Sequence, residues 1–410
     1  MRSGFPPEAA QKIWLNFCLA FPIVLCISIA AANILLGLIV VGWILKLTRR
    51  PPKIGLPLSV ILVYLTWTLI TMAASPFAAN GFAWIEERST FLALIPGFAV
   101  ASDERLMRRA FGYFAILLVG LALYSLYQYF FGWDLIRFKP LEYQSHRYHA
   151  TGFQNFHLTF AGMTALIAPA VSGFFSSDSR KSVLCASAGT MTAFSAMARS
   201  IILGYFGCAL LFAVCGSKKL RRTGFIIFLI LLVLPFTIYS TAGDRLARGL
   251  GFSGSAEQRG DPTRIYLWKS ALNVIRHHPV TGIGEANWDA AFEKYGEPFD
   301  GYSTTAGPHN DFLSAMVENG IIGGILFIAM WLVIISSFAR KARRVQDDKR
   351  DLLLGLLGAF LILLFAGLFQ DYQTDAENAL LLWFMAGLGL QLSGMLPVGK
   401  CADLCVGETA

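Results

Sequence analysis

Long apolar stretches separated by short polar segments are the main pattern along the chain. Each stretch is about twenty residues long, which is enough for a helix to cross roughly 30 Å of hydrocarbon. The pattern therefore predicts an all-α, polytopic integral membrane protein. We expect about twelve transmembrane helices, at residues 12–28, 30–47, 54–74, 89–102, 110–131, 156–175, 183–198, 200–215, 223–241, 311–338, 351–370 and 379–397.

Composition supports a membrane protein and excludes several other classes. Hydrophobic residues make up 55% of the chain and charged residues 15%, whereas a soluble domain has about 25% charged residues. A soluble enzyme, a secreted disulfide scaffold and a disordered protein are therefore excluded. The net charge of +8 is not taken as a sign of nucleic-acid binding, because the basic residues lie in loops between the expected spans.

The basic residues gather in alternate loops, and this sets the expected orientation. Apolar stretches that fit two crossings separate each basic cluster from the next, and the positive-inside rule places all of these clusters in the cytoplasm. Both termini are then cytoplasmic. The clusters are Arg49/Arg50/Lys53, Arg105/Arg108/Arg109, Arg180/Lys181, Lys218/Lys219/Arg221/Arg222 and Arg340/Lys341/Arg343/Arg344/Lys349/Arg350.

The expected organisation has one large outer insertion. Residues 1–241 hold spans one to nine, 242–310 form a periplasmic helical loop, 311–397 hold the last three spans, and 398–410 form a cytoplasmic tail. A carrier built of two similar halves would place its longest polar segment in the middle of the spans, on the inside. The position of the insertion therefore argues against such a transporter.

Arg199 is the most informative single residue. It is the only charged residue in the stretch 183–215, which is too long for one crossing and is flanked by basic loops on the same side. We therefore expect a helical hairpin with Arg199 at its outer tip. A charge at that depth is costly and marks a functional site, and the alternative is an arginine that extends to lipid phosphate groups.

A second candidate site begins at Asp261. Asp261 and Pro262 have the chemistry of a helix start, and the apolar residues Ile265, Trp268, Leu272 and Ile275 follow on one face, which predicts an amphipathic helix on the membrane surface. Arg264 shares a face with Trp268 beside the free N–H groups of the helix start, and such a pair suits a phosphate. The alternative is that Arg264 belongs to a solvated face.

A third candidate is His309, in Gly307-Pro308-His309-Asn310 just before the tenth span. The positive end of the helix dipole favours a neutral imidazole, which is the form that a general base requires. A capping or packing role is the alternative. Glu318 lies about 13 Å further along the helix and on its opposite side, so we expect it to tie helices together and do not expect it to orient His309.

The remaining polar clusters carry weaker expectations. His146, His149 and His157 have the spacing of metal ligands, but no cysteine or acidic residue close in sequence completes the set, so no metal is expected. The acidic group Asp371, Asp375 and Glu377 could bind an ion or an acceptor, or only keep its loop in water. No Walker or dinucleotide motif is present, so no nucleotide cofactor is expected.

With these residues in view, the chain resembles the bacterial O-antigen ligase and O-antigen polymerase superfamily. The resemblance is strongest over residues 183–338. Three motifs carry it in the same order and outward placement as in the family. They are Ala198-Arg199-Ser200, then Arg264-x3-Trp268 with Pro279-Val280-Thr281-Gly282-Ile283-Gly284, and then Pro308-His309-Asn310-Asp311-Phe312-Leu313 with Glu318-Asn319-Gly320-Ile321-Ile322-Gly323.

The resemblance implies a metal-independent, inverting, GT-C-like glycosyltransferase whose active site faces the periplasm. Its donor would be a glycan on undecaprenyl pyrophosphate. By resemblance, Arg199 and Arg264 would hold the pyrophosphate and His309 would activate the acceptor hydroxyl, with Trp268 and Asn310 beside them. Basic side chains of the outer loops would meet an anionic acceptor such as lipid A–core, and they are Arg137, Lys139, Arg147 and Arg248.

The members of the superfamily share this donor and differ in acceptor. Protein O-oligosaccharyltransferases usually carry an extra outer domain, and nothing of that size follows the tenth span. We therefore expect an O-antigen ligase that acts on lipid A–core, with an O-antigen polymerase or a protein O-oligosaccharyltransferase as alternatives. A lipid-linked glycan transporter is the alternative from another class, and it would bind the same donor without needing a base at His309.

Overall fold

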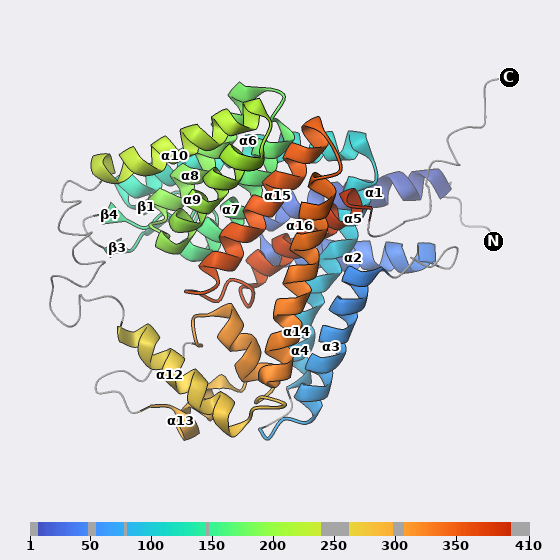
Figure 1. Ribbon diagram of the computed structural model, residues 1–410, viewed down its shortest axis with the longest axis vertical. Coiled ribbons are helices and arrows are strands. Elements are labelled where there is room, and N and C mark those ends of the chain that lie inside the picture. Colours follow the sequence, from blue (N-terminus) through green and yellow to red (C-terminus); the bar gives the residue numbers. More distant parts are fainter. Residues whose placement is uncertain are drawn as a thin grey trace.

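The computed structural model describes residues 7–47, 55–77, 80–144, 147–238, 262–297 and 307–394, and these are predominantly helical (Figure 1). Two small antiparallel hairpins pair β1 (Trp133–Asp134) with β2 (Lys139–Pro140) and β3 (Tyr143–Gln144) with β4 (Arg147–Tyr148). The helices are α1 Pro7–Leu25, α2 Ile29–Leu47, α3 Leu56–Ala73, α4 Gly81–Arg88, the 3-10 helix η1 Ser89–Ala93, α5 Leu94–Ala101, α6 Glu104–Phe131, α7 His157–Phe174, α8 Ser179–Ser195, α9 Arg199–Cys215, α10 Lys218–Ile238, α12 Pro262–His277, α13 Trp288–Tyr295, α14 Asp311–Ala342, α15 Asp347–Ala366 and α16 Ala376–Leu392.

The expected all-α membrane class is confirmed, whereas the number of crossings stays a prediction. By length and composition, α3, α6, α7 and α14 are each able to cross a membrane. Each of the other eight expected spans coincides with a helical segment, several of which are apolar but shorter. The orientation and the GT-C-like arrangement also stay predictions.

The centre of the molecule is the pairing of α7 with α15. Nearly every residue of α7 is buried, and α15 packs along it. Two glycines allow the close approach, because a Cβ at Gly173 would overlap the carbonyl oxygen of Asp351 and a Cβ at Gly355 would overlap that of Pro169. Small residues at such positions let backbones approach closely, which is how helices pack in lipid.

The expected fourth span, 89–102, is interrupted. It consists of η1 followed by the short helix α5, and α4 precedes it. The Ser89 and Thr90 hydroxyls donate to the carbonyls of Glu86 and Glu87, at 2.9 and 2.7 Å, and such local bonds compete with regular helix. The interruption places the charged end of α4 inside the protein, where it becomes part of the candidate site.

The expected hairpin at 183–215 is confirmed. The helices α8 and α9 are joined by a tight turn in which Met197 has a φ of 55°. Arg199 is the first residue of α9 and is exposed at the tip. The backbone N–H of Ala150 donates to the Ser195 carbonyl at 3.0 Å, so the segment after β4 is fastened to this turn.

The helix α14 consists of two helical segments joined at Gly320. Gly320 has a φ of 68° and a ψ of −179°, which interrupts the helical hydrogen bonds. The segment 279–284 fills the gap. Its N–H groups donate to the carbonyls of Val317 and Glu318 at 2.9 Å, and one of its carbonyls accepts from the Ile321 N–H at 2.8 Å. The two glycine-containing motifs of the sequence are therefore complementary parts of one joint.

We expect Gly320→Ala to lower the free energy of unfolding by about 1–3 kcal/mol. An alanine would be held in the left-handed region, and its Cβ would overlap the Val280 carbonyl oxygen. Thermal unfolding of the purified protein in detergent measures the change. Gly207→Ala is the matched control, because Gly207 lies inside α9 and a Cβ there meets nothing within 4 Å. Equal melting temperatures for the two variants would contradict the prediction.

The helix expected after Asp261 is confirmed as α12, which begins at Pro262, while Asp261 itself lies outside the described residues. Its apolar face differs from the expected one. Leu267, Ala271 and Val274 are buried together with Ile275 of the expected face, whereas Ile265 and Leu272 are about half exposed. The reason is that α12 packs against α13 and the first part of α14 in a small apolar cluster of its own, so a second apolar strip is left on its surface. Figure 1 shows α12 and α13 lying together at one end of the molecule.

Candidate active site

His309 lies in the short loop that leads into α14. The side chain of Asn310 caps this helix by accepting from the N–H groups of Phe312 and Leu313, at 3.0 and 3.1 Å. His309 itself has a φ of 50°, a left-handed conformation that histidine tolerates better than most residues. Its side chain is 31% exposed. The loop therefore presents an accessible imidazole from a backbone that the Asn310 cap joins to α14.

Asp371 holds this loop from the segment between α15 and α16. Its carboxylate accepts from the backbone N–H of His309 at 2.9 Å, from the N–H of Asn310 at 2.7 Å and from the Ser314 hydroxyl at 2.9 Å. The Nδ1 atom of His309 lies 3.8 Å from the same carboxylate. Asp371 thus holds the backbone of the His309 loop and places its carboxylate near the imidazole.

The environment of Asp371 has two opposing effects on its ionisation. Burial raises the pKa of the carboxyl, while the Ser314 hydroxyl, the imidazole of His309 and the two backbone N–H groups oppose the rise. The side chain is 13% exposed. A carboxyl with this many donors fixes the geometry of the loop in either protonation state, because its oxygens still accept hydrogen bonds when it is neutral.

Sequence analysis missed a buried ionic cluster around Arg88. The Arg88 guanidinium donates to the Glu285 carboxylate, and its Nη2 atom lies 3.5 Å from Glu318 and 3.7 Å from Glu87. The Glu285 side chain is completely buried and that of Arg88 is 13% exposed. Burial by itself would raise the pKa of Glu285, but the Arg88 guanidinium holds it below its usual value. Glu318 therefore ties helices together, as its position in the sequence predicts.

A cavity of about 190 Å³ separates the ionic cluster from the His309 loop. Asp371, Ser314 and Thr374 line one part of it, and Glu87 and Glu318 line another. Trp288 and Pro308 add apolar surface. Carboxylates and hydroxyls beside an aromatic ring form the kind of lining that can bind a molecule rich in hydroxyl groups.

Both candidate arginines lie near the loop that carries Asp371. Arg264 is half-buried in the first turn of α12 and Arg199 is exposed at the start of α9. Burial raises the pKa of Tyr372, next to Asp371, while the neighbouring Ser200 hydroxyl and the Arg264 guanidinium oppose this rise. Tyr372 therefore lies near Ser200, at the start of α9, and near Arg264, at the start of α12. Trp268 is half-buried, and its indole N–H has no hydrogen-bond partner among the described residues.

The other candidate residues have local structural roles or lie outside the description. Asp375 caps α16 by accepting from the Asn378 N–H at 3.1 Å, and it also accepts from the Thr159 hydroxyl. Arg137, a candidate for acceptor binding, instead pairs with Asp134 at 2.9 Å. The backbone of Arg147 lies in β4, but its side chain is not described. His146 and Arg248 lie outside the described residues.

Comparison with known proteins places similarity over the same part of the chain. Residues 182–328 match the family model described as O-Antigen ligase. The chain is also 29% identical over 132 residues to the exopolysaccharide production protein ExoQ of Rhizobium meliloti (strain 1021). That alignment spans 30% of this chain and 30% of the relative. The family match contains Arg199, Arg264 and His309, but not Arg88 or Asp371.

Proposed function

We propose, from the premise that the chain belongs to the O-antigen ligase superfamily through residues 182–328, that it is an inverting glycosyltransferase. It transfers a glycan from undecaprenyl pyrophosphate to the lipid A–core oligosaccharide. The observation that carries the proposal is the accessible His309, whose loop is held by Asp371 and lines, through Gly307 and Pro308, a cavity with polar side chains. The transfer reaction takes place in the bacterial inner membrane, and the site faces the periplasm.

His309 acts as the general base in this mechanism. Its imidazole removes the proton from an acceptor hydroxyl as that oxygen attacks the anomeric carbon of the donor sugar. The bond between this carbon and the pyrophosphate oxygen breaks on the opposite face, so the configuration is inverted and undecaprenyl pyrophosphate leaves with the electron pair. Proton removal by a well-placed base contributes about 10²–10⁴-fold in rate. Asp371 is a positioning residue, because it acts through the His309 loop.

Arg199 and Arg264 stabilise the leaving group. Guanidinium groups bind phosphate oxygens in pairs, and their charge matters most where little water competes. Arg264 is half-buried at the N-terminus of α12, where backbone N–H groups add to its effect. The indole N–H of Trp268 lies one turn further along the same helix. These groups make the pyrophosphate a better leaving group, and the energy for transfer comes from the donor bond.

An O-antigen polymerase is the second candidate. It uses the same donor chemistry and transfers the glycan to another lipid-linked glycan, so the same base and arginines serve it. The name of the similar Rhizobium protein refers to exopolysaccharide production, which favours chain assembly over capping of lipid A–core.

The test uses purified protein with lipid-linked glycan and lipid A–core. We expect glycan-capped lipid A–core to form without ATP, detected by mass spectrometry. Arg199→Gln and Arg264→Gln are expected to weaken donor binding and transfer together, while Arg276→Gln, at the other end of α12, serves as the matched control. Elongation of the donor glycan alone would identify the polymerase. No covalent product with either acceptor would refute a transferase and favour a transporter.

A further inference from the structure

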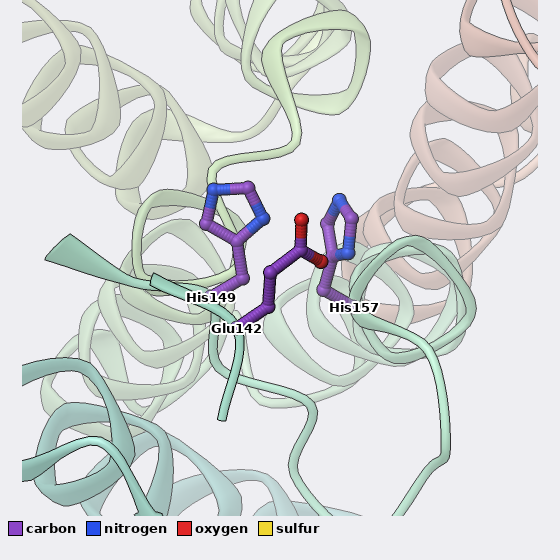
Figure 2. A group of neighbouring side chains, drawn as sticks. All are labelled: Glu142, His149 and His157. Carbon is purple, nitrogen blue, oxygen red and sulfur yellow. The ribbon is translucent and has the colours of Figure 1, made fainter. Parts of the chain in front are cut away.

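Glu142, His149 and His157 form a separate cluster on the outer segment before α7. Figure 2 shows the carboxylate of Glu142 between the two imidazole rings. One potential ligand atom from each residue lies within 4.8 Å of those of the other two, and the ring centroids of the two histidines are 4.6 Å apart. The cluster shares no residue with the His309 loop or the Arg88 cluster.

The local fold places these side chains together. Tyr143 pairs with Tyr148 across the β3–β4 hairpin, and the His149 N–H donates to the Glu142 carbonyl at 3.1 Å. Glu142 and His149 are therefore opposite each other in the ladder, and opposite residues project from the same face. His157 is the first residue of α7. The hairpin thus brings two of the three groups to the beginning of this helix.

His149 is the observation that points to a ligand. It is 7% exposed, and its Nδ1 atom is buried without a hydrogen-bond partner among the described residues. Figure 2 shows a ring nitrogen of His149 directed toward Glu142 and His157. A buried imidazole nitrogen that lacks a partner and is directed at a carboxylate and a second imidazole points to a bound ion.

We propose that Glu142, His149 and His157 bind one divalent transition-metal ion of the zinc class. Two imidazole nitrogens and a carboxylate are a common three-residue zinc set, and a water completes the tetrahedron. Ligands about 2.0–2.1 Å from the ion lie roughly 3.4 Å from one another. Glu142 is exposed, so its side chain is free to rotate toward the ion.

The ion stabilises the β3–β4 hairpin, which lies beside the α8–α9 turn that carries Arg199. It joins the β3–β4 hairpin to the beginning of α7, and the Ala150 N–H already fastens the following residue to the α8–α9 turn at Ser195. Sequence analysis predicted no metal because it found no cysteine or acidic residue close in sequence to complete the set, and it overlooked Glu142. Glu142 precedes His149 by one hairpin and supplies that ligand. This inference is independent of the proposed transfer reaction.

The test is a Co²⁺ titration of the purified full chain in detergent. We expect saturable binding of about one ion per chain with the visible absorption of a tetrahedral site, and Zn²⁺ should displace it. Glu142→Gln and His157→Gln should each weaken binding by tenfold or more. His277→Gln is the matched control, because His277 lies on α12 and stacks on Tyr295.

Either of two results would overturn the proposal. One is the lack of a saturable visible band in the wild-type chain, and the other is binding that persists unchanged in both site variants. Glu142→Gln changes an exposed side chain, so it separates lost ligation from lost folding, and thermal unfolding without metal should match that of the wild type. The titration contains no donor or acceptor, so its outcome leaves the transfer reaction to be decided by its own assay.

Discussion

Replacing His309 by asparagine is expected to lower the rate of glycan transfer by about 10²–10⁴-fold. The change removes the imidazole that takes the proton from the acceptor hydroxyl. Asparagine is the appropriate substitute, because it tolerates the left-handed backbone at this position, where φ is 50°. Single-turnover transfer from lipid-linked glycan to acceptor, followed by mass spectrometry, measures the effect. Donor binding should remain within about threefold of the wild type, because the arginines are intact.

Two further variants make this result specific. Asp371→Asn keeps an acceptor and its approximate shape but changes the group that fixes the loop, so a smaller loss of transfer is expected than for His309→Asn. His278→Asn is the control, because His278 contacts Tyr295 and Phe77 away from the loop. Transfer by His309→Asn at close to the wild-type rate, with normal donor binding, would rule out His309 as the base.

Replacing Arg88 by methionine is expected to destabilise the protein by about 3–5 kcal/mol. Glu285 is completely buried and has Arg88 as its ion-pair partner. Methionine fills much of the volume but leaves the carboxylate without compensating charge, and a buried unpaired charge costs far more than a lost surface pair. Unfolding of the purified protein in detergent, followed by intrinsic fluorescence, measures the change.

A double variant and a surface control separate the causes. Adding Glu285→Gln to Arg88→Met removes the uncompensated charge, so part of the lost stability should return. Arg108→Met is the matched control, because Arg108 pairs with Glu104 where both side chains are 70% exposed, and such pairs contribute little. If Arg88→Met and Arg108→Met unfolded at the same temperature, the ionic cluster would not contribute to the stability of the fold.

Helices could be expected from the sequence because their signals are local. Apolar stretches bounded by charged loops predict helical spans, and the lone Arg199 with basic loops on both sides predicts the α8–α9 hairpin. Pro262 at a helix start predicts α12. The buried face of α12 could not be read in the same way, because the chain supplies two apolar strips and only packing against α13 and α14 decides which of them is covered.

The candidate site also combines features that local sequence predicts with contacts that only the tertiary structure shows. The motif around His309, which includes the helix cap Asn310, can be recognised in the sequence because capping depends on residues within one turn. Asp371 lies 62 residues from His309, and Glu285 lies 197 residues from Arg88. Nothing local distinguishes such a carboxylate from one that only solvates a loop.

The sequence by itself determined that this is a helical membrane protein and where most of its helices lie, and it indicated Arg199, Arg264 and His309 as candidate site residues. Only the tertiary structure decided which carboxylates lie beside which arginine or histidine. It places Asp371 at the His309 loop, Glu285 beside Arg88, and Glu142 beside His149 and His157. The physical reason is that the free energy of a buried charge depends on its partners in space, and the packing of distant helices chooses those partners.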